Sequence, residues 1–445
     1  MPGMKKHLIA IVLLLVILVG GVVFYFGRGD TARLAPGADV GREPRFTTPR
    51  SEIFPTINVA KVKGWAANEA PVPAPGLSVA RYSDGLAHPR SLYRLPNGDI
   101  LVAETNSPPR PATGIKDRVQ NWLMAKAGAG VPSANRITLL RDADGDGRPE
   151  VKTAFLTGLN SPYGMALVGS TLYVANTDAL MAFPYKSGDT KITGAGRKVM
   201  NLPAQAPNIH WTRSLAASPE GLLYVGVGSN SNIGENGLDN EANRAAVLEV
   251  DPKKGSYRIY ASGLRNPVGL AFEPVSGALW GVVNERDMLG ADLVPDYLAR
   301  IEFAGFYGWP WNYWGGYEDR RVQPQRPEVR EYTKRPDYAL GNHVAPLGLT
   351  FAAQAKLGPR FANGAIVGLH GSWNRKPASG YKVVFVPFTA DGEAGKGKPI
   401  DILGGFLNES GDARGRPVDV AIDSSGALLV SDDVGGIIWR VTAKN

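Results

Sequence analysis

The sequence predicts an all-β protein, a six-bladed β-propeller with an N-terminal transmembrane anchor helix. Three observations support this prediction. The chain contains 54 glycines and 34 prolines, a supply of turn residues that suits many short strands. A unit of two apolar strands recurs six times. A single long apolar run precedes all of these units.

The apolar run covers residues 8–26 and follows Lys5 and Lys6. Its 19 residues, at about 1.5 Å each, reach about 28 Å as a helix, which is close to the hydrocarbon thickness of a bilayer. A cleaved signal peptide is the alternative. The run is longer than a usual signal core, and no small-x-small cleavage site follows Phe26. We therefore expect an uncleaved anchor.

The flanking charges predict the orientation of this anchor. The two lysines favour a cytoplasmic N-terminus, although Arg28 and Arg33 on the other flank reduce the bias. Residues 1–7 are thus expected in the cytoplasm and the rest of the chain in the periplasm, at a bacterial inner membrane. Residues 27–75 are rich in proline, glycine and arginine and predict a linker. Residues 76–445 are expected to form the propeller.

Composition excludes some classes of protein. Without cysteine, no disulfide framework holds the fold together, so stability must come from packing and strand pairing. The formal charge is +8, but the basic residues are scattered and no nucleic-acid-binding motif occurs. The positive field favours anionic small molecules or lipid headgroups as partners instead.

Each recurring unit contains an apolar stretch, a turn of Pro, Asp, Asn or Gly, and a second apolar strand. Such units are typical of paired antiparallel strands, and their repetition is typical of propeller blades. A β-sandwich is the alternative, which six similar units disfavour. The units cover residues 90–104, 161–176, 213–227, 266–283, 345–369 and 416–431.

Three insertions interrupt the repeats. Residues 106–134 include 114–126, whose apolar spacing suits a short amphipathic helix. Residues 288–344 contain an aromatic stretch at 306–314, and residues 374–380 are short and basic. Long loops on one face of a propeller are where binding sites are usually built.

Two histidines stand at the ends of predicted strands. His210 precedes the first strand of the third unit, which places it at the mouth of the channel, and His370 directly follows the strand pair of the fifth. A structural role is the other interpretation of each.

Arginines recur at equivalent ends of other units. The guanidinium fork suits carboxylates, so several arginines that converge on one channel indicate a polyanionic ligand. Solvated surface charge is the alternative for any single arginine. The residues concerned are Arg265 with Asn266, Arg375 with Asn374, and Arg414 with Arg416.

Two acidic groups are candidate metal sites. Glu285 and Asp287 close the fourth unit and predict a site for a hard cation such as Ca²⁺, although pairing with Arg286 or neighbouring arginines is equally compatible. The run from Asp142 to Asp146 has the alternating oxygens of calcium loops. It lacks the downstream glutamate of an EF-hand, so an acidic hairpin turn remains open.

Several phrases together resemble the soluble pyrroloquinoline quinone (PQQ)-dependent sugar dehydrogenases, and more closely their sorbosone dehydrogenase branch. The resemblance covers roughly residues 75–443. It implies a six-bladed propeller, in agreement with the repeats. The phrases are Gly263-Leu264-Arg265-Asn266-Pro267, Asn284-Glu285-Arg286-Asp287, Tyr307-Gly308-Trp309-Pro310 and His370-Gly371-Ser372-Trp373-Asn374-Arg375.

The resemblance also implies a site. His210 would remove the hydroxyl proton of the sugar, and Arg265 with Asn266 would reach the quinone. Arg414 and Arg416 would bind the carboxylates of PQQ. Arg375 lies near the place of a lysine in the family, and the loop from Glu285 to Asp287 would hold the activating Ca²⁺, largely on backbone oxygens.

The expected function is therefore a PQQ- and Ca²⁺-dependent oxidoreductase that oxidises an aldose or sugar aldehyde by hydride transfer and passes electrons to a respiratory acceptor. The sequence departs from the glucose-oxidising members at Ile209 and Ser229, where those enzymes place acidic residues. Two alternatives stay open. One is a non-catalytic periplasmic propeller that binds a partner through residues 306–314, and the other is a Ca²⁺-dependent lactonase-like hydrolase.

Overall fold

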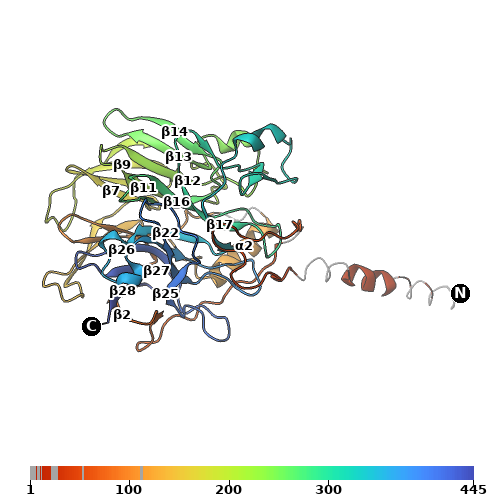
Figure 1. Ribbon diagram of the computed structural model, residues 1–445, viewed down its shortest axis with the longest axis horizontal. Helices are drawn as coiled ribbons and strands as arrows, with labels where there is room; N and C mark the ends of the chain where they lie inside the picture. The colour runs from red at the N-terminus through yellow and green to blue at the C-terminus, as the bar shows by residue number, and fades with distance from the viewer. Residues whose placement is uncertain are drawn as a thin grey trace.

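The computed structural model describes residues 29–52, 55–110 and 114–444, with His7, Ile11 and residues 13–21 nearer the N-terminus. Six sheets of four or five strands surround a central channel (Figure 1). The predicted all-β, six-bladed propeller is confirmed.

The six recurring units are the two inner strands of each blade. Five of the six second strands are buried at every residue, because neighbouring blades cover both of their faces. The innermost strands are β3 (Pro89–Arg94), β7 (Met165–Val168), β11 (Arg213–Ala217), β15 (Pro267–Phe272), β22 (Pro346–Phe351) and β26 (Pro417–Ile422). The second strands are β4 (Ile100–Glu104), β8 (Thr171–Ala175), β12 (Leu223–Val227), β16 (Leu279–Val283), β23 (Gly364–Leu369) and β27 (Leu428–Asp432).

The outer strands complete the blades by antiparallel pairing, and several of them are half-exposed. The third strands are β5 (Arg136–Arg141), β9 (Ala179–Pro184), β13 (Ala246–Asp251), β17 (Pro295–Arg300), β24 (Lys382–Pro387) and β28 (Ile437–Ala443). The fourth strands are β6 (Val151–Leu156), β10 (Arg197–Asn201), β14 (Ser256–Ser262), β21 (Tyr338–Asn342), β25 (Ile400–Gly404) and β2 (Leu77–Ser83).

The ring is closed by strands from opposite ends of the chain. The outermost strand of the last blade is β2, which pairs with the C-terminal β28 so that Leu77 lies opposite Ala443. Opening the ring therefore requires that a full strand ladder breaks. The first and last parts of the propeller are thus joined by strand pairing, without a disulfide.

The insertion after β17 packs against the propeller instead of forming an exposed loop surface. It contains β18 (Gly305–Phe306), β19 (Asn312–Tyr313) and β20 (Tyr317–Glu318). The aromatic side chains at its centre, Tyr307, Trp309, Tyr313 and Trp314, are buried. Arg286 fixes this insertion by donating hydrogen bonds to the carbonyl oxygens of Pro310 and Asn312, both at 2.6 Å. The prediction of an aromatic binding surface at residues 306–314 is wrong for these side chains.

The predicted linker is part of the folded body. Residues 29–52 and 55–66, which we call the strap, run over the loops of the later blades. The backbone N–H of Ala32 donates to the carbonyl of Lys376 at 2.7 Å, and that of Asn58 donates to the carbonyl of Trp373 at 2.7 Å. The Trp65 indole donates to Asp432 at 2.7 Å. The prediction of a free tether over residues 27–75 is therefore wrong for the described part, which includes β1 (Val72–Pro73) on the edge of β25.

The predicted helix in the first insertion is confirmed as α2 (Ile115–Lys126). The predicted anchor over residues 8–26 falls partly outside the described residues, as do Lys5, Lys6 and Arg28. Its described part, residues 13–21, is helical. Among the described residues, no helix has both the length and the apolar character needed to cross a bilayer. The anchor stays a prediction.

Candidate active site

The two ends of the channel differ in chemistry. His210, Arg265 and Arg416 each precede an innermost strand, so they lie at the end where those strands begin. The loops that connect the second and third strands of the blades lie at the same end. We call this end the site face.

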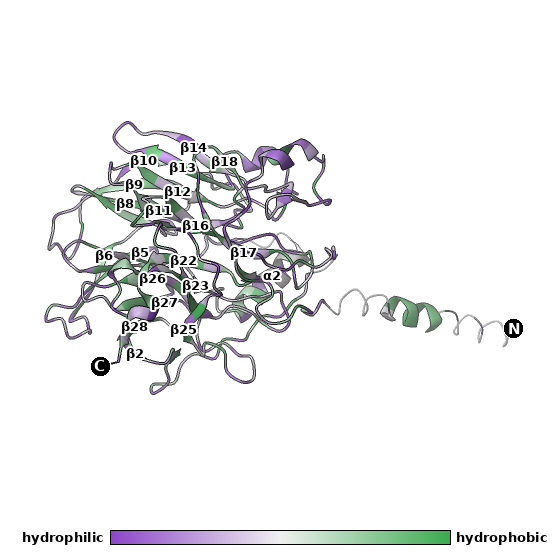
Figure 2. Cartoon of the chain, viewed as in Figure 1, coloured by the Kyte–Doolittle hydropathy of each residue, from purple (hydrophilic) through white to green (hydrophobic). Residues whose placement is uncertain are grey.

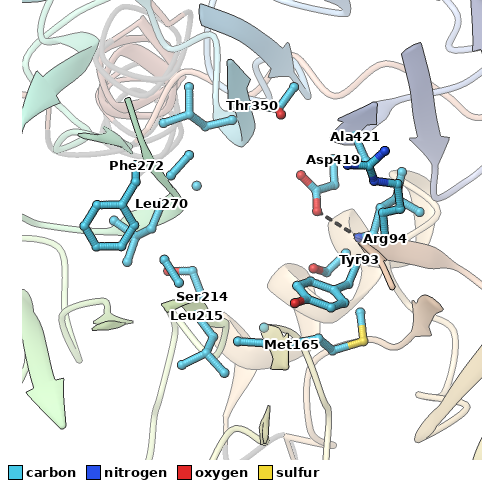
Figure 3. A pocket seen from close by; sticks show the side chains of 18 of the residues that line it. Tyr93, Arg94, Met165, Ser214, Leu215, Leu270, Phe272, Thr350, Asp419 and Ala421 are labelled. Carbon is cyan, nitrogen blue, oxygen red and sulfur yellow. Dashed lines mark hydrogen bonds between the residues drawn. The ribbon is translucent and has the colours of Figure 1, made fainter. Parts of the chain in front are cut away.

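The opposite end holds a pocket of about 660 Å³ that reaches all six innermost strands. Figure 3 shows Tyr93, Met165, Leu215 and Phe272 around its open centre. The one carboxylate drawn there, Asp419, accepts a hydrogen bond from the backbone N–H of Leu92 at 2.8 Å, and burial raises the pKa of this carboxyl to about 6.

An apolar layer lies at the start of the inner strands, between this pocket and the polar groups of the site face. It comprises Tyr163, Trp211, Val268, Leu347 and Val418, contributed by five blades. The pocket of about 660 Å³ is therefore separate from the site. The polar side chains that could act in a reaction are concentrated at the site face.

His210 is held through one ring nitrogen, and the other, Nε2, has no hydrogen-bond partner among the described residues. Its Nδ1 lies 2.9 Å from the carbonyl oxygen of Ser229 and 3.0 Å from the Ser229 hydroxyl. A carbonyl oxygen only accepts, so Nδ1 carries the proton and Nε2 keeps its lone pair. Burial and the positive charges of Arg265, Arg110 and Arg244 hold the pKa of His210 well below its usual range. The imidazole is thus neutral at pH 7 and suited to accept a proton.

A pocket of about 1100 Å³ lies at the loop that leads into His210, where Asn208 and Ile209, but not His210 itself, line it. It is lined by residues 107–110, 129–133 and 206–209, by Asn121, Met124 and Ala125 of α2, and by Asn160, Thr177, Asp178 and Ala204. Arg110 joins these walls by donating to the carbonyl oxygens of Asn208 at 2.9 Å and Ile209 at 3.2 Å. This pocket has the size and position of a substrate site next to the histidine.

Gly228 permits the close packing of His210 against the next blade. A β-carbon there would lie 2.4 Å from Asn266 Oδ1 and 2.5 Å from His210 Cβ. We expect Gly228→Ala to displace the imidazole and to lower kcat about 10²-fold, because an error of about 1 Å in a catalytic group costs that much. Rates of dye reduction would measure the loss. Gly404→Ala, whose β-carbon would meet nothing within 4 Å, is the matched control and should be neutral. Equal rates in both variants would contradict the argument.

Arg265 and Asn266 differ in how far they are engaged by the protein. Arg265 donates to the Glu285 carbonyl oxygen at 2.6 Å and to Asn232 Oδ1 and Asp287 Oδ2, both at 3.0 Å. These bonds occupy most of its donors. Asn266 is buried, and its Oδ1 has no hydrogen-bond donor among the described residues. In this arrangement Arg265 organises the loop after β16, while Asn266 retains an unused polar atom.

The two predicted metal ligands are both ion-paired. Glu285 Oε2 accepts from Arg286 Nε at 3.0 Å, and Asp287 accepts from Arg265 and from the Asn374 amide at 2.8 Å. The other oxygen of Glu285, Oε1, is buried with no donor among the described residues. The site therefore keeps one uncommitted carboxylate oxygen for a cation.

A second acidic group lies at the turn between β5 and β6. Oxygens of Asp142, Asp144, Asp146 and Glu150 approach within 4.8 Å of one another, so Glu150 supplies a fourth carboxylate beyond the predicted run. All but Asp142 are exposed. This turn is at the end of the propeller opposite the site face, so it plays no part in the site.

The three remaining predicted arginines occupy different environments. Arg375 donates to the carbonyl of Ala291 at 2.9 Å and pairs with Asp292 at 3.4 Å, which makes it a loop brace. Arg414 is one-third exposed and lies 3.5 Å from Glu69 of the polypeptide that follows the strap. Arg416 is 5% exposed, and neither its Nε nor its Nη2 has an acceptor among the described residues. Of these three arginines, only Arg416 has buried donors without an acceptor among the described residues.

Sequence reasoning missed most of the cluster that surrounds Arg416. Asp433 Oδ2 accepts from Arg90 Nη1 at 2.7 Å and from His370 Nε2 at 3.0 Å. His88 Nε2 lies 3.6 Å from the same carboxylate. The signal for Arg90 was present, because it opens the first recurring unit as Arg416 opens the last. Asp433 and His88 lie at the same ends of their blades but carry no pattern that marks them.

This cluster is a positively charged, incompletely satisfied site. Burial lowers the pKa of His370 to about 4 and also lowers that of His88, so both are neutral at pH 7. Two guanidiniums then face one carboxylate. Arg90 Nε, Arg416 Nε and Arg416 Nη2 are all buried without an acceptor among the described residues. Unpaired buried donors are costly, and an anionic ligand would satisfy them.

The buried histidines predict a pH dependence of stability. His370 has a folded pKa of about 4 against an ordinary 6.5, so between these values the unfolded chain binds a proton that the folded protein does not. Stability should therefore fall as pH drops from about 6.5 to about 4. Midpoints of thermal unfolding across this window would measure the fall. His370→Gln should flatten the curve, and a curve unchanged by that substitution would contradict the assignment.

Comparison with known proteins agrees with the fold. A family model described as TrAA12-like matches residues 71–295 and 324–444, so the chain belongs to this family. An uncharacterised protein of Borreliella burgdorferi is 29% identical over 364 residues, which cover 79% of this chain and 91% of that protein. A PQQ-dependent pyranose dehydrogenase of Coprinopsis cinerea is 28% identical over 289 residues, 52% of this chain and 39% of the relative.

Solved structures share the architecture. The holo form of the PQQ domain of the Coprinopsis cinerea pyranose dehydrogenase superposes with a TM-score of 0.67 at 22% identity, covering 86% of this chain and 100% of that one. A calcium structure of a Trichoderma reesei Family AA12 carbohydrate-active enzyme gives a TM-score of 0.68 at 19% identity, covering 87% and 99%. At these identities the likeness concerns the fold.

Proposed function

We propose that this TrAA12-like protein is a PQQ-dependent sugar dehydrogenase that uses the site face of the propeller. The observation that carries the proposal is a neutral His210 together with buried arginine donors; among the described residues, Nε2 of His210 has no partner and these donors have no acceptor. Relatives named as PQQ-dependent sugar or pyranose dehydrogenases support it. The sorbosone dehydrogenase branch remains an expectation of the sequence resemblance.

The residues present fit the cofactor. PQQ carries three carboxylates, and Arg90 and Arg416 offer unpaired donors at the channel mouth. Gly228 brings His210 and Asn266 together, and the Arg90 guanidinium carbon lies 5.7 Å from the ring centre of Trp211, the residue after His210. When bound there, PQQ supplies the electrophile that takes up the hydride of the substrate. Ca²⁺ is the proposed second cofactor, and the uncommitted Oε1 of Glu285 supports its placement at the loop after β16.

The protein's own groups perform the proton chemistry. In this proposal a sugar hydroxyl bound next to Ile209, which lines the pocket, reaches Nε2 of the adjoining His210, which accepts its proton as the C–H hydride leaves. The Ser229 carbonyl keeps Nδ1 protonated and fixes the ring, in place of the acidic neighbour of the glucose-oxidising enzymes. Arg110 holds the pocket wall. The substrate is an aldose or a hydrated sugar aldehyde in this proposal.

The test is reconstitution of the purified full chain with PQQ and Ca²⁺, followed by dye reduction with a panel of aldoses and sugar aldehydes. Stoichiometric PQQ binding with sugar-dependent reduction is expected. Absence of both PQQ binding and turnover would overturn the proposal. The lactonase alternative predicts lactone hydrolysis without quinone, which the same preparation would show.

The location is likewise proposed. The apolar run over residues 8–26 supports attachment to a bacterial inner membrane with the propeller in the periplasm, where a respiratory acceptor would receive the electrons. A reporter that is active only in the periplasm, fused to the C-terminus, should be active if this orientation is right. A reporter active only in the cytoplasm would contradict it.

A further inference from the structure

The strap and α2 meet on the site face. Gly128, just beyond the end of α2, packs between the strap and the last blade so tightly that a β-carbon would lie 2.8 Å from both Val62 and Val434. The strap in turn bonds to Lys376 and Trp373 of the loop after β23. These contacts join α2, the strap and that loop into one surface, which we call the docking surface.

The docking surface combines exposed apolar and basic side chains. Trp122 is 63% exposed, although the helix that carries it looked amphipathic enough to bury this ring. Met124 of α2, Ile57 of the strap and Trp373 of the loop after β23 are exposed at 40%, 45% and 38%. The exposed basic residues of the same surface are Arg33, Lys61, Lys63, Arg118, Lys126 and Lys376.

In the sequence, the strap follows the most apolar segment of the chain. The strap begins at Gly29, and within three residues it bonds to Lys376 of the docking surface. The described helix before it, residues 13–21, is hydrophobic (Figure 2), and leucines, isoleucines and valines from Ile11 to Val19 are 56% to 69% exposed. An apolar helix that leads into a basic and aromatic face is a combination suited to a bilayer.

We propose that the docking surface lies against an anionic lipid bilayer. Tryptophan settles at the boundary between headgroups and acyl chains, where its ring is buried and its N–H stays wet. Basic residues near a negatively charged leaflet are attracted to it, and salt screens this attraction. Six such residues beside Trp122 and Trp373 match that environment in charge and chemistry. A basic protein partner would lack this complementarity.

Docking in this orientation would also affect the reaction, and this step rests on the proposed function. The pocket beside His210 is walled by Asn121, Met124 and Ala125 of α2. Docking of α2 would therefore place the mouth of that pocket next to the membrane. A lipid-soluble electron acceptor would then reach the cofactor without leaving the bilayer surface.

The absence of cysteine makes a direct test possible. The full chain with Asn121→Cys, on α2, would carry an environment-sensitive fluorophore and be reconstituted into vesicles of phosphatidylglycerol and phosphatidylcholine. Ser187→Cys, exposed in the turn between β9 and β10 at the opposite end of the blades, is the matched control. Spin-labelled lipid should quench the label at position 121 several-fold more than that at 187, and high salt should reduce the difference. Equal quenching at both positions would overturn the proposal.

A second pair of variants tests the contribution of the tryptophan. Trp122→Glu, in the protein labelled at position 121, should remove most of the quenching. Ile259→Glu, 47% exposed on the outer edge of the third blade, should leave it unchanged. Unaltered quenching in Trp122→Glu would overturn the proposal. Dye-linked turnover in detergent reports the proposed activity separately, so loss of docking and loss of catalysis are distinguishable.

Discussion

Replacing His210 by glutamine is expected to reduce kcat for sugar oxidation by about 10²–10⁴-fold, the usual contribution of a general base. Glutamine keeps a hydrogen-bonding side chain near Ser229, whose carbonyl accepts from Nδ1 at 2.9 Å, but it has no basic lone pair to replace Nε2. PQQ affinity should change little, because the unpaired arginine donors belong to a different cluster. Single-turnover dye reduction with saturating PQQ would measure the loss.

The pH profile provides the second readout of the same prediction. Burial and Arg265 lower the pKa of His210 well below its ordinary value of 6.5, so the neutral base persists into acid. The acid limb of kcat/KM in the parent enzyme should therefore lie below pH 6.5, and it should disappear in His210→Gln. A variant that keeps its turnover within a few-fold, or keeps the acid limb, would show that another group is the base.

The blades could be predicted from the sequence because their inner strands are buried on both faces. That burial demands apolar runs in strands such as β12 and β27, and these runs form the visible repeat. The outer strands face solvent in part, as β10 and β14 do, and their mixed composition carries no comparable signal. The closure of the ring by β2 could not be predicted either, since its partner β28 lies at the other end of the chain.

The site was predictable in its position and less so in its bonding. Arg265 and Arg416 both lie just before an innermost strand, so the repeat pattern of the sequence predicts the same role for both. Their roles separate only when Asn232, in a loop without any pattern, takes up donors of Arg265, while no such neighbour reaches Arg416. Asp433 is a similar case, because its importance comes from the meeting of Arg90 and His370 from different blades.

The strap shows why a composition typical of linkers can be misleading. Its prolines, glycines and arginines form few regular strands, but its polar backbone finds partners in the loops of the later blades. Asp292 accepts from the backbone N–H groups of Arg33 and Leu34, at 2.5 and 3.1 Å. Such pairings depend on loops that are close only in the folded propeller. The local sequence therefore correctly predicted an irregular segment. It was wrong in predicting a linker, because the segment is packed on the propeller.

Arg416→Ala is expected to weaken PQQ binding by about 10²–10⁴-fold, because two hydrogen bonds to charged groups contribute about 1.5–3 kcal/mol each. The reason is the pair of buried donors, Nε and Nη2, which have no acceptor among the described residues and await an anion. Arg414→Ala is a close control two positions away. Its guanidinium is one-third exposed and already lies 3.5 Å from Glu69, so its loss should change PQQ affinity by less than about five-fold.

Stability without PQQ distinguishes a binding role of Arg416 from a structural one. A buried guanidinium that lacks acceptors destabilises the free protein, because its desolvation is not compensated. The apo form of Arg416→Ala should therefore unfold at the same temperature as the parent or at a higher one, while titration with PQQ shows the lost affinity. A lower unfolding temperature together with unchanged PQQ binding would instead assign Arg416 to the scaffold. The arginine would then serve to pack against Tyr381, whose ring centre lies 5.5 Å from its guanidinium carbon.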